Sequence, residues 1–174
     1  MTADLIEIVP PDKDWPAQFE VESKRVALAL AGETLFAIEH FGSTAIGGLS
    51  AKPIIDILIA VPSVAEARKS FPEALRPEGY VFWADNPDRD RLFFVKGMPP
   101  FGSRRTHHVH ICERPSVMWD RLKFRDYLRG NPGEAARYSI LKQDLADKYP
   151  QDREAYTRGK GRFITQIMEL VEAS

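Results

Sequence analysis

The sequence of 174 residues predicts an α/β (α+β) fold, in which a mixed β-sheet is flanked by helices and the C-terminal third is helical. An almost wholly apolar run at 53–61 has the length of one strand and no polar alternation, which is typical of a strand buried on both faces. Strand-like and helical stretches alternate on both sides of this run, as in a layered sheet with helices. Beyond Pro115 the apolar spacing becomes helical.

Local signals define the individual elements. Residues 5–11 alternate in polarity and contain two prolines, which predicts a short edge strand. An N-cap aspartate and a proline in the first turn predict a helix over 15–31. By the same reasoning the remaining strands are expected at 35–40, 53–61, 79–84, 91–97 and 106–113, and the remaining helices at 62–75, 115–129, 133–148 and 151–172. We expect 91–96 and 106–112 to pair as an antiparallel hairpin.

The composition is that of an ordinary globular protein, expected to form one domain over residues 1–174. Its one cysteine, Cys112, excludes an internal disulfide. The first residues carry acids and prolines where a signal peptide has basic and apolar regions. No apolar run approaches the roughly 18–20 residues that span a bilayer. We therefore expect a cytoplasmic protein without a membrane segment.

The net charge of −1 hides an uneven distribution of charges along the chain. Residues 1–88 carry 7 Lys or Arg against 14 Asp or Glu, whereas residues 89–125 carry 9 against 3. A short basic segment in a nearly neutral protein favours a compact phosphate-bearing ligand over nucleic acid, because nucleic-acid-binding domains are usually basic overall. The alternative is a basic surface that pairs with acidic helices elsewhere.

Asp56 is the only polar residue in the apolar run at 53–61. Burying a lone carboxylate among isoleucines costs several kcal/mol unless a cation or hydrogen-bond donors compensate it. Just upstream, Gly42 and Ser43 form a turn at the end of a predicted strand, where free backbone N–H groups suit a phosphate. An ordinary tight turn is the alternative. The segment matches neither a Walker A loop, whose lysine is missing, nor a GxGxxG fingerprint.

Four blocks of the sequence carry a family resemblance. "IEHFGSTAIGGLSAKPIIDILIAV", "RTHHVHICE", "KFRDYL" with "YSILKQDLA", and "DREAYTRGKGRFI" resemble successive blocks of the GrpB-like family, in the same order and over about residues 8–170. That family is grouped with the nucleotidyltransferase (polymerase-β-like) superfamily, whose signature is a glycine–serine turn, a short helix and a strand that bears an acid. It is also found fused to dephospho-CoA kinase in some proteins, which suggests a link to coenzyme A biosynthesis.

The resemblance implies a nucleotidyltransferase-like fold and roles for several residues. Gly42, Ser43 and Thr44 would hold the phosphates of a nucleotide. Asp56 would be the catalytic carboxylate that binds Mg²⁺ for an in-line phosphoryl displacement. One departure from the pattern matters, because the superfamily has a second acid two residues further on, where this chain has Leu58. Either the missing ligand comes from elsewhere or transfer activity has been lost.

His108 and His110 are the candidates for the missing ligands. On a strand these two residues share one face. If that strand lies beside 53–61, the two imidazoles and Asp56 form a set suited to Zn²⁺, Mn²⁺ or Fe²⁺, with His40 near its edge. The alternatives are that the histidines bind phosphate, hydrogen-bond Asp56, or serve only packing.

Four basic residues are candidates for phosphate contacts: Lys52, Arg105, Lys142 and Lys160. Lys142 and Lys160 each follow a tyrosine at i,i+4 spacing, so Tyr138 and Tyr156 share a helix face with them. By the family resemblance, a helical lysine would reach the β- and γ-phosphates of a nucleotide. The alternative for each pair is a solvated helix face with the tyrosine packed inward.

Three functions remain open from the sequence. The first is an enzyme that binds a nucleoside triphosphate with a divalent metal, Mg²⁺ or Mn²⁺, and transfers a nucleotidyl group. The second is a non-catalytic module that binds a nucleotide or another phosphorylated small molecule, which the leucine at the second acid position favours. The third is a metal-dependent phosphoester hydrolase with Zn²⁺ or Mn²⁺ on the histidine pair.

Overall fold

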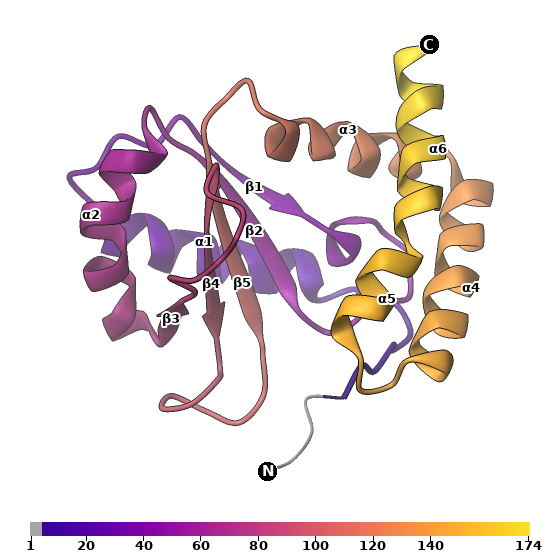
Figure 1. The fold of residues 1–174 in the computed structure, drawn as a ribbon, viewed down its shortest axis with the longest axis horizontal. Helices are drawn as coiled ribbons and strands as arrows, with labels where there is room; N and C mark the ends of the chain where they lie inside the picture. The colour runs from indigo at the N-terminus through magenta and orange to yellow at the C-terminus, as the bar shows by residue number, and fades with distance from the viewer. Residues whose placement is uncertain (1–4) are drawn as a thin grey trace.

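A five-stranded mixed sheet forms the centre of the computed structural model, which describes residues 5–174. The strands are β1 (Ala37–Phe41), β2 (Ile55–Ala60), β3 (Tyr80–Phe82), β4 (Arg91–Lys96) and β5 (His107–Cys112). They lie in the order β1-β2-β5-β4-β3 (Figure 1). The β2–β5 pair is parallel and the other neighbouring pairs are antiparallel, which confirms the predicted mixed sheet and the predicted hairpin of β4 and β5.

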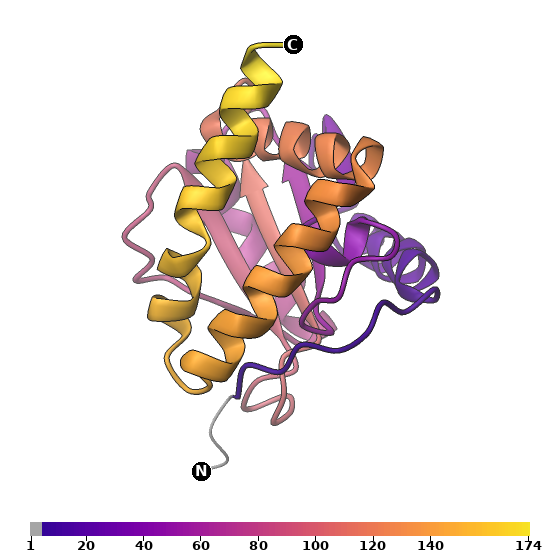
Figure 2. The same cartoon turned by 90° about the vertical axis from the view of Figure 1, so that its right-hand side faces the viewer.

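Helices cover both faces of this sheet. They are α1 (Trp15–Ala29), α2 (Val64–Leu75), α3 (Val117–Gly130), α4 (Pro132–Lys148), α5 (Arg153–Gly159) and α6 (Gly161–Glu172), with the 3-10 helices η1 (Ser43–Ala45) and η2 (Arg76–Glu78). Residues of α1 and α2 share one core cluster with the sheet, while α3 to α6 gather on the other side (Figure 1). Figure 2 shows α4 and α6 in front of the sheet, with strands behind them.

The two faces of β2 contact different elements. Its isoleucines at 55, 57 and 59 join the core cluster of α1 and α2. Leu58 points the other way and packs with Met118 and Leu122 of α3. Because side chains alternate along a strand, Asp56 lies on the Leu58 face, on the side of the C-terminal helices.

The predicted edge strand over residues 5–11 does not form. Within it only Val9 pairs, in an isolated bridge with Ala51. Pro10 and Pro11 follow directly, and proline lacks the N–H group that would extend the ladder. This segment therefore runs along the molecule without joining the sheet.

The predicted last helix is two helices, α5 and α6, which meet at Lys160. Gly159 and Gly161 flank this residue, and glycine has a low helix propensity. Gly159 also lies against Leu145 of α4, where a Cβ atom would have no room. The C-terminal third therefore has four helices instead of the predicted three.

The segment that follows β1 connects the C-terminal helices to the sheet. Ile46 and Leu49 share a core cluster with residues of α3, α4 and α6. The Ser50 N–H donates to the hydroxyl of Ser139 over 3.2 Å, and the carbonyl of Ser50 accepts from Lys142. Residues 43–50 thus fix the position of α4 relative to β2.

Candidate functional site

Asp56, His108 and His110 come together on one face of the sheet, and we call them the histidine–aspartate cluster. In the parallel register of β2 and β5, Asp56 lies opposite His108, and Leu58 lies opposite His110. His108 Nδ1 is 3.0 Å and His110 Nε2 is 3.5 Å from Asp56 Oδ1. One ligand atom from each residue lies within 4.8 Å of the others. By residue type and spacing this set fits a divalent cation.

The two imidazoles keep Asp56 ionised. Burial by itself raises the pKa of a carboxyl, but hydrogen bonds from His108 and His110 hold the pKa of Asp56 well below its usual range. Burial also lowers the pKa of His110 to about 4, against the opposing effect of Asp56. At neutral pH the cluster therefore contains an aspartate anion and a neutral His110 that acts as a hydrogen-bond donor.

The tautomer of His108 follows from its surroundings. Its Nδ1 lies next to the Asp56 carboxylate, whereas its Nε2 is buried and has no hydrogen-bond partner in the described part of the chain. A proton on Nδ1 satisfies the carboxylate, while a proton on Nε2 would bury an unpaired N–H and leave two lone pairs facing each other. His108 is therefore also a donor to Asp56.

Arg91 of β4 is the outer neighbour of His110. Its Nη1 is 2.9 Å from His110 Nδ1, and its Nε is 2.7 Å from Asp88 Oδ2. The ring of Phe93, from the same strand, lies 5.0 Å from the His108 ring and 4.7 Å from the His110 ring, centroid to centroid. The histidine–aspartate cluster therefore has an arginine and an aromatic wall on the β4 side.

Gly42 lies in contact with Asp56. Its φ of +73° is in the left-handed region, and a Cβ on this residue would come 2.5 Å from Asp56 Oδ2. The next residue, Ser43, begins η1 and lies near the Tyr138 hydroxyl of α4, where burial raises the pKa of Tyr138 and Ser43 opposes this rise. The Gly42-Ser43 turn therefore lies near both Asp56 and α4.

Thr44 and His40 point away from Asp56. Phe41 lies opposite Asp56 in the register of β1 and β2, so His40 points to the α1 face, where its ring stacks on Phe19 at 4.7 Å. The Thr44 hydroxyl is 3.0 Å from His40 Nε2 and donates to a backbone carbonyl over 3.4 Å. His40 was expected near the edge of the cluster; strand alternation places its side chain on the opposite face of the sheet, and the charge of Asp56 still acts on it.

Lys142 and Lys160 lie near each other and near Lys52. The Nζ of Lys142 is 4.8 Å from the ring centre of Tyr138, and that of Lys160 is 4.6 Å from the ring centre of Tyr156. Lys52 Nζ is 5.1 Å from the same Tyr156 ring. The two i,i+4 pairs thus bring tyrosine rings and amino groups from α4, α5 and the loop before β2 into one region.

Burial and mutual repulsion lower the pKa of both helical lysines. Burial and then the charges of Lys160 and Lys52 lower the pKa of Lys142 to about 7, although its Nζ donates to the Ser50 carbonyl. Burial and Lys52 lower the pKa of Lys160 to about 8, opposed by the charge of Asp56. Crowded amino groups of this kind are stabilised when an anion binds between them.

Arg105 and Lys52 line a small pocket together with Arg104 and Arg153. The pocket lies where the loop between β4 and β5 approaches the start of β2 and α5. Lys52 therefore connects two basic regions, this pocket and the helical lysines.

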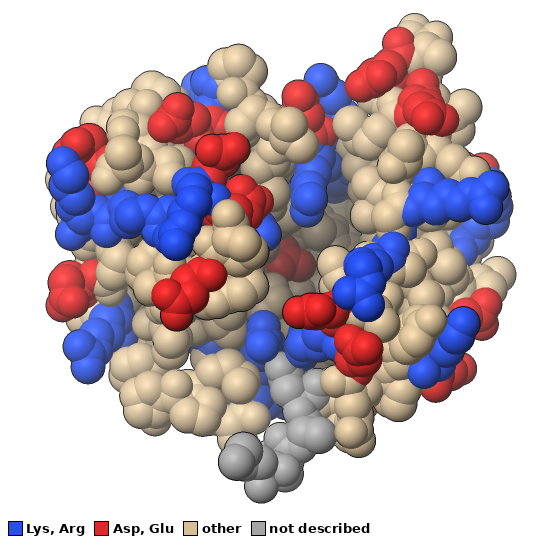
Figure 3. All heavy atoms as spheres, viewed as in Figure 1, with Lys and Arg blue, Asp and Glu red and all other residues tan. Residues whose placement is uncertain are grey.

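Figure 3 shows that the molecular surface is hollowed between the sheet and the helices α5 and α6. Lys and Arg side chains line this hollow, and carboxylate-bearing side chains are visible deep inside it. Arg121 of α3, an exposed residue, adds positive charge that acts on Tyr138 and Lys160. Neither Arg121 nor Lys160 forms an ion pair within residues 5–174.

Sequence reasoning missed Arg91 and Arg121. The hairpin register pairs Phe93 with His110 and Arg91 with Cys112, which puts Arg91 on the histidine face. The sequence predicted the hairpin but not its register. With the register known, the alternation of side chains at 91, 93 and 95 would have identified Arg91. Arg121 is an exposed residue of α3, three positions after the buried Met118, and helical spacing alone did not single it out.

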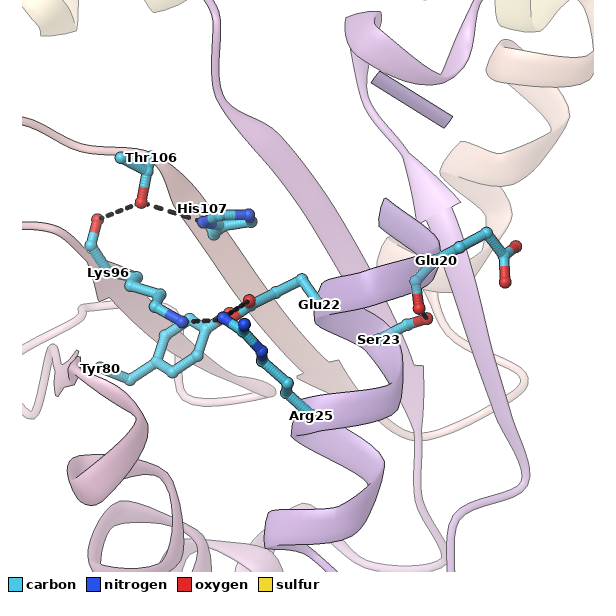
Figure 4. A network of polar contacts seen from close by, with 8 residues as sticks. All are labelled: Glu20, Glu22, Ser23, Arg25, Tyr80, Lys96, Thr106 and His107. Atoms are coloured by element: carbon cyan, nitrogen blue, oxygen red, sulfur yellow. Dashed lines mark hydrogen bonds and ion pairs between the residues drawn. The ribbon is translucent and has the colours of Figure 1, made fainter. Parts of the chain in front are cut away.

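A second polar cluster lies on the α1 face, away from the histidine–aspartate cluster (Figure 4). The buried Glu22 of α1 accepts hydrogen bonds from Tyr80 over 2.9 Å and from Lys96 over 2.6 Å. Arg25 Nη1 is 3.8 Å from the other carboxylate oxygen, and the charge of Glu22 also acts on His107. These partners satisfy the carboxylate, so this cluster holds α1 against β3 and β4.

Fold and site together define a class of α+β protein, in which a mixed sheet carries a histidine–aspartate cluster beneath basic C-terminal helices. The chain belongs to the GrpB protein family, whose sequence model matches residues 5–170. This confirms the resemblance found in the sequence. No helix among residues 5–174 is both long and apolar enough to cross a bilayer.

Three comparisons place the chain among its relatives. It is 51% identical to a UPF0157 protein of Pseudomonas aeruginosa, over 95% of this chain and 67% of that one. The crystal structure of the conserved protein GrpB from Enterococcus faecalis superposes with a TM-score of 0.82 and 31% identity, over 95% of this chain and 96% of the other. A protein of Mycolicibacterium paratuberculosis named dephospho-CoA kinase is 30% identical over 89% of this chain but only 43% of its own length.

Proposed function

We propose that this protein binds a nucleotide or another phosphate-bearing small molecule, together with a divalent metal ion, as a member of the nucleotidyltransferase superfamily. The observation that carries the proposal is the arrangement of charges in the hollow. The Asp56 carboxylate lies within the electrostatic influence of Lys160, which itself repels Lys52 and Lys142. A phosphate chain with a bound cation satisfies both signs at once, because the cation pairs with the carboxylate and the phosphates pair with the amino groups.

The chain's own residues have separate tasks in this proposal. The Gly42-Ser43 turn, Lys142 and Lys160 contact phosphate oxygens, since amino groups that repel one another are stabilised when an anion binds between them. Asp56 with His108 and His110 would hold the metal ion, and each imidazole would then give up the proton that it directs at Asp56 in the metal-free protein. When bound, the ion neutralises charge on the phosphates and on a leaving group.

A binding function without transfer is the second candidate, and Leu58 favours it. Leu58 occupies the position of the second acid in the superfamily pattern, is fully buried, and packs with Phe41, Met118 and Leu122. No carboxylate can replace it there without being buried among apolar side chains. The similarity to the protein named dephospho-CoA kinase supports a ligand related to nucleotides or to a coenzyme A precursor in either case.

A ligand screen tests the proposal directly. Thermal unfolding of the full chain is measured with ATP, GTP, CTP, UTP or dephospho-CoA, each combined with Mg²⁺, Mn²⁺ or Zn²⁺. Because a ligand that binds the folded state raises the unfolding midpoint, we expect a shift that needs both nucleotide and metal. Asp56→Asn and Lys160→Met are each expected to lose it.

Two control variants test whether the shift depends on these particular residues. Asp144→Asn and Lys69→Met change exposed residues of the same types and are expected to keep the shift. Turnover of the bound nucleotide would identify an enzyme, and binding without turnover would identify a module. A shift with Zn²⁺ alone would move the assignment to a phosphoester hydrolase, and no shift with any ligand would contradict the proposal.

A further inference from the structure

The contacts of His110 fix the position of its proton. Its Nδ1 lies 2.9 Å from Nη1 of Arg91, and its Nε2 lies 3.5 Å from Oδ1 of Asp56. A guanidinium group has only donors, so Nδ1 must accept with its lone pair. The ring is therefore neutral and carries its one proton on Nε2, where it points at Asp56.

This tautomer conflicts with metal binding. A metal ion needs the bare lone pair of a ring nitrogen, and the nitrogen of His110 nearest to Asp56 is the protonated one. Histidines that bind metals usually donate the N–H of the other ring nitrogen to a carboxylate, carbonyl or water. Here the partner at the other nitrogen is itself a donor, which excludes the tautomer that a metal requires.

Arg91 is placed so that an anion can compete for it. One side of its guanidinium bonds Asp88 over 2.7 Å, and its central carbon lies 5.7 Å from the Phe93 ring centre. Its side chain is 20% exposed, so a ligand can reach it. Arg121 lies within its electrostatic reach and forms no ion pair within residues 5–174. A phosphate or carboxylate group binds such an arginine through two parallel hydrogen bonds, more strongly than a neutral imidazole does.

We propose that Arg91 is a positioning residue. Its hydrogen bond to Nδ1 keeps the proton of His110 on Nε2, so that this nitrogen cannot bind a metal ion until an oxyanion of the ligand binds the Arg91 guanidinium. The hydrogen bond to Nδ1 is then released, the Nε2 proton passes to solvent water, and Nδ1 takes up a proton from solvent water, so that the ring stays neutral and no net proton is gained or lost. Nε2 becomes available to the metal ion. The inference rests on the proposed function for the nature of the ligand. It adds that anion and metal bind cooperatively, each raising the affinity for the other by the same factor.

The first test determines the tautomer, and it needs neither ligand nor metal. Nitrogen NMR of the full chain labelled with ¹⁵N-histidine distinguishes protonated from bare ring nitrogens, and the His110→Gln spectrum assigns the signals. We expect a bare Nδ1 and a protonated Nε2 in the wild type and in Arg91→Lys, because lysine is also only a donor. In Arg91→Leu this preference is expected to be lost. A proton on Nδ1 of the wild type would overturn the inference while leaving the proposed function untouched.

The second test measures Mn²⁺ affinity by calorimetry, with and without inorganic sulfate as the oxyanion. We expect sulfate to raise the affinity of the wild type about 10-fold, within the usual range of coupling between sites. Arg91→Leu is expected to bind Mn²⁺ more tightly than the wild type without sulfate and to gain little from it. Arg89→Leu is the control, because the side chain of this exposed neighbour bonds only the backbone carbonyl of Ala84 and should behave like the wild type. Equal Mn²⁺ affinity of wild type and Arg91→Leu, or no binding to Arg91→Leu, would contradict the coupling.

Discussion

At the scale of single residues, the site depends on close contacts around one carboxylate. Asp56 is hydrogen-bonded by His108, its Oδ1 lies 3.5 Å from Nε2 of His110, and it leaves no room for a side chain at Gly42. The sequence predicted that Asp56, His108 and His110 would meet, because strand alternation and a neighbouring strand are enough for that. It could not predict their proton positions, which depend on Arg91 and on the hairpin register.

Gly42→Ala is expected to destabilise the protein by about 1–3 kcal/mol. The residue has a positive φ, and the new methyl group would come 2.5 Å from Asp56 Oδ2, so both backbone and carboxylate must shift. Gly47→Ala is the matched control, because its Cβ would meet nothing within 4 Å and its φ is not in the left-handed region. Urea unfolding measures both variants. Equal stability of the two would show that the turn relaxes freely.

Lys142 is expected to make stability rise with pH. Its folded-state pKa of about 7 lies below that of an unfolded lysine, so between these values only the unfolded chain holds the proton. Raising the pH from about 7 to 9 therefore favours the folded state by up to about 2 kcal/mol, and Lys142→Met should remove this gain. Urea unfolding at both pH values measures it, with Lys148→Met as the control. Parallel pH profiles of wild type and Lys142→Met would show that Lys142 stays charged in the folded protein.

At the scale of elements, polar contacts decide how helices sit on the sheet. Arg125 of α3 bonds Glu39 and the His40 carbonyl of β1, each over 2.8 Å. Glu22 of α1 bonds residues of β3 and β4 on the other face (Figure 4). Apolar periodicity predicted that helices lie over 15–31 and 115–129. The side chains that fix their positions belong to long-range pairs, which a single sequence does not reveal.

Glu22→Gln is expected to lower the free energy of unfolding by about 3 kcal/mol at neutral pH, because it leaves buried donors without their anion. Burial raises the pKa of Glu22, but bonds from Lys96 and Tyr80 and the charge of His107 outweigh it and lower the pKa overall. A carboxyl with a lowered folded-state pKa stabilises the protein above its unfolded pKa, and this contribution is lost as the pH falls through the folded value. The difference in the free energy of unfolding between the wild type and Glu22→Gln should therefore disappear in acid.

Glu20→Gln is the control for this prediction. Glu20 lies on the same helix with an exposed side chain, and only its backbone carbonyl takes part in the contacts of Figure 4. Chemical unfolding across the acid range should leave Glu20→Gln within about 0.5 kcal/mol of the wild type. If the two variants were equally stable, the Glu22 cluster would contribute nothing to holding α1 on the sheet.

At the scale of the whole molecule, the site lies between two halves that pack separately. α1 and α2 share their core with one face of the sheet, whereas α3, α4 and α6 share theirs with residues 46 and 49 of the loop before β2. The sequence predicted the mixed sheet and most elements, because length, periodicity and prolines are local signals. It missed the break at Lys160, where two glycines and the contact of Gly159 with Leu145 end α5.

A ligand in the hollow should therefore make the separation of the two halves from each other less frequent. Asp56 belongs to the sheet, while Lys142 and Lys160 belong to the C-terminal helices, so a bound phosphate chain with its cation would bridge them. We expect nucleotide and Mn²⁺ together to increase amide hydrogen-exchange protection in residues 43–50 and 138–160, because these segments separate when the halves open. Asp56→Asn should remove the added protection at both segments. Protection spread evenly over the chain, α1 and α2 included, would instead indicate that the molecule opens as one unit and that the ligand stabilises it only globally.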